Sequence, residues 1–246
     1  MENFSLIITA AGAGTRFGGK LEKQFVQILG KPLLYWSVKA FMNIKQITEV
    51  VLVIPENSFE KNSKFFKNTF PDIEVVFGGE DRFQSVYRGL DALKNRDGFV
   101  LIHDGVRACI SKKTIGSIIK KAQECGAAIP VVPCVGSLKE VQEGRVVKSL
   151  DRDKIFSATT PQCFRLVDIL LLYKKAFYQK LSFADEASMF EHYGIEVSVV
   201  YDTPTNIKIT TKEDLAFATF ILSKSYKKPH SNNLCSNSSI AKNNLN

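Results

Sequence analysis

Short apolar segments alternate with segments of helical periodicity along most of this 246-residue chain, which limits the folds open to it. Phe4–Thr9, Ile73–Phe77 and Phe99–His103 are mostly apolar and rich in β-branched or aromatic residues. Between such segments, apolar residues recur every three or four positions, as they do from Ile115 to Ala122. Strands that are apolar on both sides are typical of a parallel sheet covered by helices. The sequence therefore predicts an α/β fold with a Rossmann-like, mostly parallel sheet and helices on both faces.

The same patterns place further elements along the chain. They predict strands at Glu49–Ile54, Ala127–Val132 and Ile195–Tyr201, and helices at Leu166–Tyr178, Asp185–Tyr193 and Lys212–Leu222. The alternation breaks after Pro133, where two short apolar stretches, Val135–Val141 and Val146–Leu150, flank the turn signal Glu143-Gly144. We therefore predict a single domain, residues 1–223, with an inserted β-arm at residues 134–158.

The positive charge of the chain is concentrated at its C-terminal end. The formal net charge is +8, and residues 224–246 hold four lysines and no acidic residue. Residues 1–223 therefore carry a net charge of only +4. The C-terminal segment is rich in Ser and Asn and too poor in large apolar groups to offset the entropy of ordering it. We predict a disordered basic tail there, and we expect no nucleic-acid partner for the folded domain.

The sequence also bears on the compartment of the protein. No apolar run approaches the roughly 20 residues that span a bilayer, and Met1–Ser5 lacks the basic region of a secretory signal. The five cysteines are widely spaced and form no CxxC pair, which indicates reduced thiols. We expect a cytoplasmic protein without a membrane partner, or a protein of the plastid stroma if the source organism bears plastids.

A glycine-rich loop, Ala10–Gly19, follows the first predicted strand. Glycines let backbone N–H groups approach phosphate oxygens, because no Cβ intervenes. A dinucleotide fingerprint has the pattern GxGxxG, whose third glycine would stand one place before Gly18. The fingerprint also requires an acidic residue at the end of a strand about 20 residues later, and this residue is missing. Both differences disfavour a dinucleotide-binding oxidoreductase. Three cations, Arg16, Lys20 and Lys23, lie within or just beyond this loop. The combination favours a triphosphate as the ligand.

Motifs along the chain carry a family resemblance. The segments Ala10-Ala11-Gly12-x-Gly14-x-Arg16 and Lys23-Gln24 resemble the signature loop of sugar-phosphate nucleotidyltransferases. Later blocks, in an order that covers residues 5–222, resemble the 2-C-methyl-D-erythritol 4-phosphate cytidylyltransferase family. These blocks are Gly78-Gly79-Glu80-Asp81-Arg82, Ser85-Val86, His103-Asp104-Gly105-Val106-Arg107, Ser137-Leu138-Lys139, Asp151-Arg152, Thr160-Pro161-Gln162-x-Phe164, Asp185-Glu186-Ala187-Ser188 and Asn206-Ile207-Lys208-Ile209-Thr210.

The resemblance implies an enzyme that uses Mg²⁺ to transfer a cytidylyl group from CTP to a polyol phosphate, 2-C-methyl-D-erythritol 4-phosphate, in non-mevalonate isoprenoid biosynthesis. It implies catalytic roles for Lys23, Arg16 and Lys208, and Mg²⁺ binding by Asp104. The implied nucleotide-binding residues are Ala10, Ala11, Gly12, Gly14, Gly79, Glu80, Arg82 and Ser85. The implied residues around the methylerythritol phosphate are Arg107, Ser137, Arg152 and Thr160. It also implies a homodimer whose exchanged arm, residues 134–158, brings Ser137 and Arg152 into the partner's site.

The residues themselves leave alternatives open. Asp104 could merely cap a turn, the acids Asp185 and Glu186 are typical of a helix N-terminus, and His103 and Gln162 favour structural roles. A ribitol 5-phosphate cytidylyltransferase would share the loop and the metal chemistry. An RNA-binding module would explain the net charge, but it predicts aromatic residues among basic ones on exposed strands, and the strands here are aliphatic.

Overall fold

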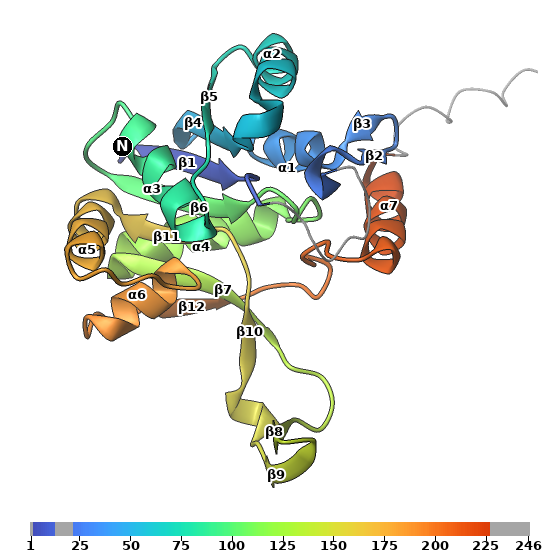
Figure 1. The fold of residues 1–246 in the computed structure, drawn as a ribbon, viewed down its shortest axis with the longest axis vertical. Coiled ribbons are helices and arrows are strands. Elements are labelled where there is room, and N and C mark those ends of the chain that lie inside the picture. Colours follow the sequence, from blue (N-terminus) through green and yellow to red (C-terminus); the bar gives the residue numbers. More distant parts are fainter. Residues whose placement is uncertain (1, 13–21, 227–246) are drawn as a thin grey trace, which may run out of the picture.

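A central eight-stranded sheet organises the protein, as the computed structural model shows for residues 2–12 and 22–226 (Figure 1). Seven of its strands follow one another in the order β10-β7-β11-β6-β1-β4-β5, and β12 also pairs with β7. The strands β6, β1, β4 and β5 run parallel to one another, and β12 runs parallel to β7. The strands β10 and β11 run antiparallel to theirs. The predicted mostly parallel sheet is thus confirmed.

The elements of the sheet and its surroundings have the following bounds. The sheet strands are β1 (Phe4–Thr9), β4 (Ile47–Ile54), β5 (Ile73–Phe77), β6 (Phe99–Asp104), β7 (Ala127–Pro133), β10 (Phe156–Ala158), β11 (Gln162–Arg165) and β12 (Ser198–Tyr201). Two small two-stranded sheets consist of β2 (Gln27–Ile28) with β3 (Lys31–Pro32) and β8 (Lys139–Gln142) with β9 (Arg145–Ser149). The helices are α1 (Leu33–Phe41), α2 (Phe59–Thr69), α3 (Arg82–Ala92), α4 (Lys112–Cys125), α5 (Leu166–Tyr178), α6 (Glu186–His192) and α7 (Lys212–Tyr226).

Helices cover both faces of the sheet, as the apolar strands require. Alternate residues of β1 point to opposite sides, so Leu6 and Ile8 join one core cluster and Ile7 joins another. The first cluster contains apolar residues of α1, α2 and α4, and the second contains those of α3, α5 and α6. Burial of apolar surface on both faces stabilises the sheet and fixes the edge where its parallel strands end.

Besides the short strands β2, β3 and β10, one helix and one strand of the body were not predicted. The helix α2 lies between β4 and β5, and the strand β11 lies inside the sheet, antiparallel to both of its neighbours β6 and β7. Both ends of β11 are polar in sequence, since it runs from Gln162 to Arg165, and its four residues are too few for a periodic signal. The strand predicted at Ile195–Tyr201 begins only at Ser198.

The inserted segment forms a projecting β-hairpin. The strands β8 and β9 pair with each other, and all of their residues are exposed. Figure 1 shows this hairpin extending away from the body of the protein, joined to the sheet through β7 and β10. The hairpin was predicted, although β8 begins later than the predicted stretch and β9 begins and ends one residue earlier than predicted.

The last helix, α7, closes the fold beside the start of α1. Ala218 and Leu222 of α7 are buried against Trp36 and Val106. The helix ends at Tyr226. Residues 224–226 are therefore helical, and the prediction that the disordered tail begins at residue 224 is wrong for these three residues. The rest of that predicted tail lies outside the described residues. No helix in the described part of the chain is long and apolar enough to cross a membrane.

Candidate active site

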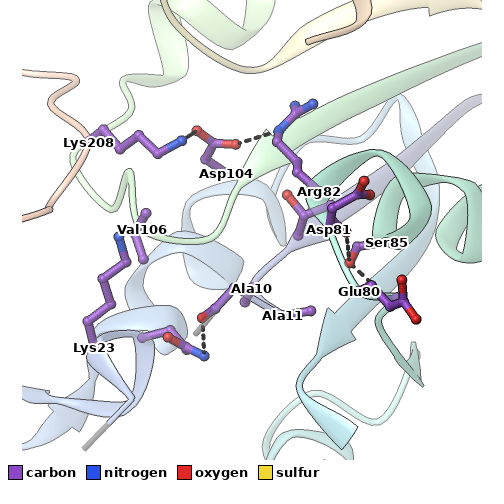
Figure 2. Close-up of a pocket in the computed structure, with 14 residues that line it drawn as sticks. Ala10, Ala11, Lys23, Glu80, Asp81, Arg82, Ser85, Asp104, Val106 and Lys208 are labelled. Atoms are coloured by element: carbon purple, nitrogen blue, oxygen red, sulfur yellow. Dashed lines mark hydrogen bonds and ion pairs between the residues drawn. The ribbon is translucent and has the colours of Figure 1, made fainter. Parts of the chain in front are cut away.

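A cavity of about 330 Å³ opens at the edge of the sheet where β1, β5 and β6 end (Figure 2). Open α/β sheets bind their ligands at this edge. Its walls come from the segments after these strands, from a short 3₁₀-helix and from the segment before α7. The lining residues are Thr9, Ala10, Ala11, Gly12, Lys23, Gln24, Gly79, Glu80, Asp81, Arg82, Ser85, Asp104, Val106 and Lys208.

The segment between β5 and α3 forms one wall and is fixed by its own hydrogen bonds. Asp81 caps α3, because its carboxylate accepts the N–H of Gln84 at 2.7 Å. The Ser85 hydroxyl donates to the Asp81 carbonyl oxygen at 2.7 Å and accepts the Gly79 N–H at 3.1 Å. A Cβ on Gly78 would lie 2.1 Å from the Cβ of Ala11, so only glycine permits this contact with the first loop. This wall of the cavity is therefore held in place by its own hydrogen bonds and by its contact with the first loop.

Gln24 and Lys23 form the opposite wall. Gln24 is almost fully buried, and its side-chain amide lies 3.5 Å from the Gly12 carbonyl oxygen, which it faces as a donor. This contact ties the 3₁₀-helix Lys23–Phe25 to the end of the first loop. Lys23 lines the cavity beside this anchor, on the same side as Val106 (Figure 2).

Asp104 is the electrostatic centre of the site. The residue is 6% exposed and lies at the end of β6. Lys208 Nζ approaches one oxygen at 2.9 Å and Arg82 Nε the other at 3.3 Å, from opposite sides (Figure 2). Arg107 Nε lies 3.5 Å from the first oxygen. Burial alone would raise the pKa of this carboxyl group, but the three cations outweigh burial and hold its pKa well below the usual range.

Arg82 is held by a second carboxylate that the sequence did not reveal as a site residue. Its two terminal nitrogens donate to the two oxygens of Glu186 at 2.8 and 2.9 Å. Glu186 is 2% exposed and also accepts the hydroxyl proton of Tyr173 at 2.9 Å. Burial opposes the charge of Arg82, but Glu186 and Asp104 together raise its pKa above the ordinary value. Arg82 is therefore a fixed cation between two carboxylates.

Behind Asp104, His103 and Thr160 connect two neighbouring strand ends. His103 is fully buried, and its Nε2 faces the Arg107 carbonyl oxygen at 3.3 Å, so this nitrogen carries the proton. The Thr160 hydroxyl accordingly donates to His103 Nδ1 at 3.0 Å and accepts the Asp104 N–H, also at 3.0 Å. The predicted structural role of His103 is confirmed.

His103 should make the protein sensitive to acid. Burial lowers the pKa of His103 to about 4, with Asp104 opposing and Arg107 adding to this effect. The unfolded chain therefore takes up a proton near pH 6.5 that the native state excludes, and stability is lost as the pH falls from about 6.5 to 4. We expect the free energy of unfolding to fall by about 3 kcal/mol across this window. Urea unfolding of the protein and of His103→Gln at several pH values measures the effect.

The variant should show a flatter pH dependence, because it lacks the group that takes up the proton. His192→Gln changes an exposed histidine and is the matched control, with an expected slope equal to that of the unmodified protein. Equal slopes for His103→Gln and the unmodified protein would contradict the assignment.

The structure brings ten of the predicted site residues to the cavity: Ala10, Ala11, Gly12, Lys23, Gly79, Glu80, Arg82, Ser85, Asp104 and Lys208. Arg107 and Thr160 are buried behind Asp104 and do not line the cavity. Ser137 and Arg152 are exposed on the arm and do not line it either, although Arg152 borders a separate hollow at the base of the arm. Gly14 and Arg16 lie outside the described residues.

Two further residues have the structural roles that their sequence context predicts. Asp185 caps α6 in a reciprocal arrangement with Ser188. Gln162 donates to Asp185 at 2.8 Å and accepts the Ala187 N–H at 3.1 Å, so it supports the segment that carries Glu186. Within the described ranges, no group of three or more His, Cys, Asp or Glu side chains is placed to hold a metal ion.

Comparison with known proteins identifies relatives over almost the whole chain. Residues 4–224 match the family of 2-C-methyl-D-erythritol 4-phosphate cytidylyltransferase. The protein of that name from Clostridium botulinum is 35% identical over 223 residues, which cover 89% of this chain and 99% of the relative. The one from Petrotoga mobilis is 38% identical over 215 residues, with 86% and 95% covered.

Solved structures give the same result. The crystal structure of Francisella tularensis 2-C-methyl-D-erythritol 4-phosphate cytidylyltransferase aligns with a TM-score of 0.77 and 33% identity, over 89% of this chain and 99% of that one. A 4-diphosphocytidyl-2C-methyl-D-erythritol synthase from Anaerococcus prevotii aligns with a TM-score of 0.80 and 29% identity, over 90% and 96%. These relatives favour neither a ribitol phosphate enzyme nor an RNA-binding module. The chain belongs to the 2-C-methyl-D-erythritol 4-phosphate cytidylyltransferase family.

Proposed function

We propose that the protein transfers a cytidylyl group from CTP to 2-C-methyl-D-erythritol 4-phosphate in non-mevalonate isoprenoid biosynthesis. The products are 4-diphosphocytidyl-2-C-methyl-D-erythritol and pyrophosphate. Family membership supports the reaction, and one observation in the structure carries it. The cavity combines a loop without large side chains, Ala10–Gly12, with two lysines, Lys23 and Lys208, from distant parts of the chain. Such a cavity suits a nucleotide whose phosphates meet a second phosphate.

In this reaction, a phosphate oxygen of the acceptor attacks the α-phosphorus of CTP. The bond from that phosphorus to the bridging oxygen breaks, and pyrophosphate leaves with the electron pair. The attacking oxygen is already an anion, so no general base is needed, and catalysis rests on positioning and charge stabilisation. His103 fits this scheme, because it is buried and neutral and does not line the cavity.

Lys23 and Lys208 both line the cavity, which supports our assignment of them to the two sides of the α-phosphate, where they would stabilise the negative charge that grows there. We assign Arg16, which lies outside the described residues, to the triphosphate. The wall formed by Gly79, Glu80 and Ser85 would receive the cytidine, because its backbone and side-chain polar groups are held in place before the ligand arrives.

Asp104 is the residue that would hold Mg²⁺. It offers one buried carboxylate at the cavity wall, and Mg²⁺ in nucleotide sites is often bound by one or two carboxylates plus phosphate oxygens. Arg82 and Lys208 pair with the two oxygens of Asp104, so Mg²⁺ would take the place of at least one of these cations. When bound, Mg²⁺ would neutralise phosphate charge. Arg107 and Thr160 then support the carboxylate from behind.

The exposed arm supports a homodimer. Val141, Val146 and Val147 expose between 54% and 62% of their surface on β8 and β9, which is unusual for three valines on one hairpin. Ser137 and Arg152 carry polar groups suited to a sugar phosphate, yet neither lines the cavity of its own chain. We therefore assign them to the cavity of a second copy. The cytoplasmic location remains a prediction from the sequence.

An assay of pyrophosphate release tests the proposed function. The protein with CTP and Mg²⁺ should release pyrophosphate with 2-C-methyl-D-erythritol 4-phosphate and show no comparable turnover with ribitol 5-phosphate. Removal of divalent cations by a chelator should abolish turnover, and added Mg²⁺ should restore it. Preference for ribitol 5-phosphate would overturn the substrate assignment, and full activity with excess chelator would overturn the role of the metal.

A further inference from the structure

Asp202 is a buried carboxylate that lies outside the cavity and follows β12. It is 8% exposed, and its backbone N–H donates to the Val131 carbonyl oxygen at 2.8 Å. Its two oxygens accept four hydrogen bonds, all 2.8 Å or shorter. The donors are the Thr114 hydroxyl (2.8 Å), the Thr203 N–H (2.7 Å), the Thr159 hydroxyl (2.7 Å) and the Asn206 side-chain amide (2.6 Å). A carboxylate with this many partners orders the segments that supply them.

These segments lead directly to the charged centre of the site. The Asn206 amide that binds Asp202 also donates to the Thr160 carbonyl oxygen at 2.9 Å. The carbonyl oxygen of Asn206 accepts Nη1 of Arg107 at 2.8 Å. Asp202 therefore holds a turn that contacts both groups behind Asp104, the Thr160 segment and the Arg107 guanidinium.

The same turn leads into Lys208. Asn206 stands two residues before it, and the backbone N–H of Ile209, one residue after it, donates to the Val106 carbonyl oxygen at 3.0 Å. Lys208 is thus anchored on one side by the turn that Asp202 holds and on the other by the segment after β6. Its side chain is 40% exposed and reaches Asp104 across 2.9 Å. The direction of that side chain depends on these two anchors.

We propose that Asp202 is a positioning residue that holds Lys208 and Arg107 against Asp104. This inference rests on the proposed function for its catalytic consequence, but not for its structural part. Asp202 acts through Asn206 and Thr159 and touches no substrate. The position of the catalytic Lys208 therefore depends on the hydrogen bonds by which Asp202 holds the segment after β12.

A carboxylate is required at this position for two reasons. Two of its partners, the Thr203 N–H and the NH2 group of Asn206, can only donate. They bind different oxygens of Asp202, so the NH2 group of an asparagine at position 202 would face one of these donors in either orientation. The charge of Asp202 also stabilises the nearby Arg107 guanidinium. With Asp202 included, the charged network connected to Asp104 has three carboxylates (Asp104, Glu186 and Asp202) and three cations (Arg82, Arg107 and Lys208). Asp202→Asn removes this charge with almost no change in shape.

Lysine labelling tests the structural part without any turnover. An amine-reactive acylating reagent, limited to short exposure and followed by peptide mass mapping, reports how freely each lysine reacts. We expect Lys208 to be labelled several-fold faster in Asp202→Asn than in the unmodified protein, because its pairing with Asp104 loosens. Lys67, which pairs with Glu74 on the surface at 3.5 Å, is the internal control and should react equally in both.

Steady-state kinetics test the catalytic part. Asp202→Asn should lower kcat/KM for the acceptor by about 10- to 100-fold, the usual cost of changing a group that supports the residues in direct contact with a metal or substrate. KM for CTP should change less than about two-fold, since the nucleotide wall is held by its own bonds. Glu49→Gln is the matched control, because Glu49 accepts the N–H groups of Lys94 and Asn95 near the opposite ends of the strands. It should lower thermal stability and leave Lys208 labelling and kinetics unchanged.

Unchanged labelling of Lys208 in folded Asp202→Asn overturns the proposal, whatever the activity. If Asp202→Asn does not fold, Thr159→Val removes one of the four hydrogen bonds and keeps the charge. Faster labelling of Lys208 is again the expected result, and unchanged labelling again overturns the proposal. If the unmodified protein shows no cytidylyl transfer, the proposed function fails, while the labelling experiment still decides the role of Asp202.

Discussion

Lys208→Ala is expected to lower turnover by about 100- to 1,000-fold, the usual loss when one preorganised donor to a developing oxyanion is removed. The Lys208 ammonium lies at the cavity wall, 2.9 Å from Asp104. From there it can exchange its ion pair with Asp104 for one with the phosphate once the nucleotide enters. Its contribution grows as negative charge accumulates at the α-phosphorus. The loss should therefore appear in kcat, with a much smaller change in KM for CTP.

Stability should be nearly unaffected, because the Lys208 side chain is 40% exposed and Asp104 keeps Arg82 and Arg107 as partners. The measurement is pyrophosphate release under saturating substrates, with thermal unfolding to verify the fold. Lys212→Ala removes an exposed lysine four residues later, at the start of α7, and is the matched control. Near-normal turnover of Lys208→Ala would refute the role of Lys208 in the reaction.

Much of the framework follows from patterns that are local in sequence. The bounds of β1, β5 and α5 agree with prediction at both ends, because the periodicity of each is continuous until a loop begins. The candidate site residues are also recognisable, since several of them come directly after such strands. This explains why the cavity contains Gly12, Asp104 and most of the other predicted residues.

The support behind the cavity could not be predicted in the same way. Glu186 has the sequence context of an exposed acid in the first turn of a helix, and only its contact with Arg82, 104 residues away, shows that it is buried. Asp202 and Asn206 lie in a polar turn without periodicity. The strand β11 escaped prediction because its place in the sheet depends on partners in β6 and β7. These features arise from long-range pairing, which one sequence does not display.

Restored activity in a mixture of two inactive variants is the second large effect we expect. Arg152→Ala alone should lose most turnover, although its side chain is 65% exposed and absent from the cavity of its own chain. Lys208→Ala alone should also be inactive. A dimer of one Arg152→Ala subunit and one Lys208→Ala subunit would contain one intact site, formed by the body of the first and the arm of the second.

Random exchange of subunits should make half of the dimers mixed, so an equal mixture should recover about a quarter of the activity of the unmodified protein. Sedimentation analysis would first establish the dimer, and two differently tagged subunits would verify the exchange. Mixing Lys23→Ala with Lys208→Ala is the control without rescue, because both residues line the cavity of a single chain and no mixed dimer regains a complete site. Exchange without rescue for the Arg152→Ala pair would mean that each arm serves its own subunit.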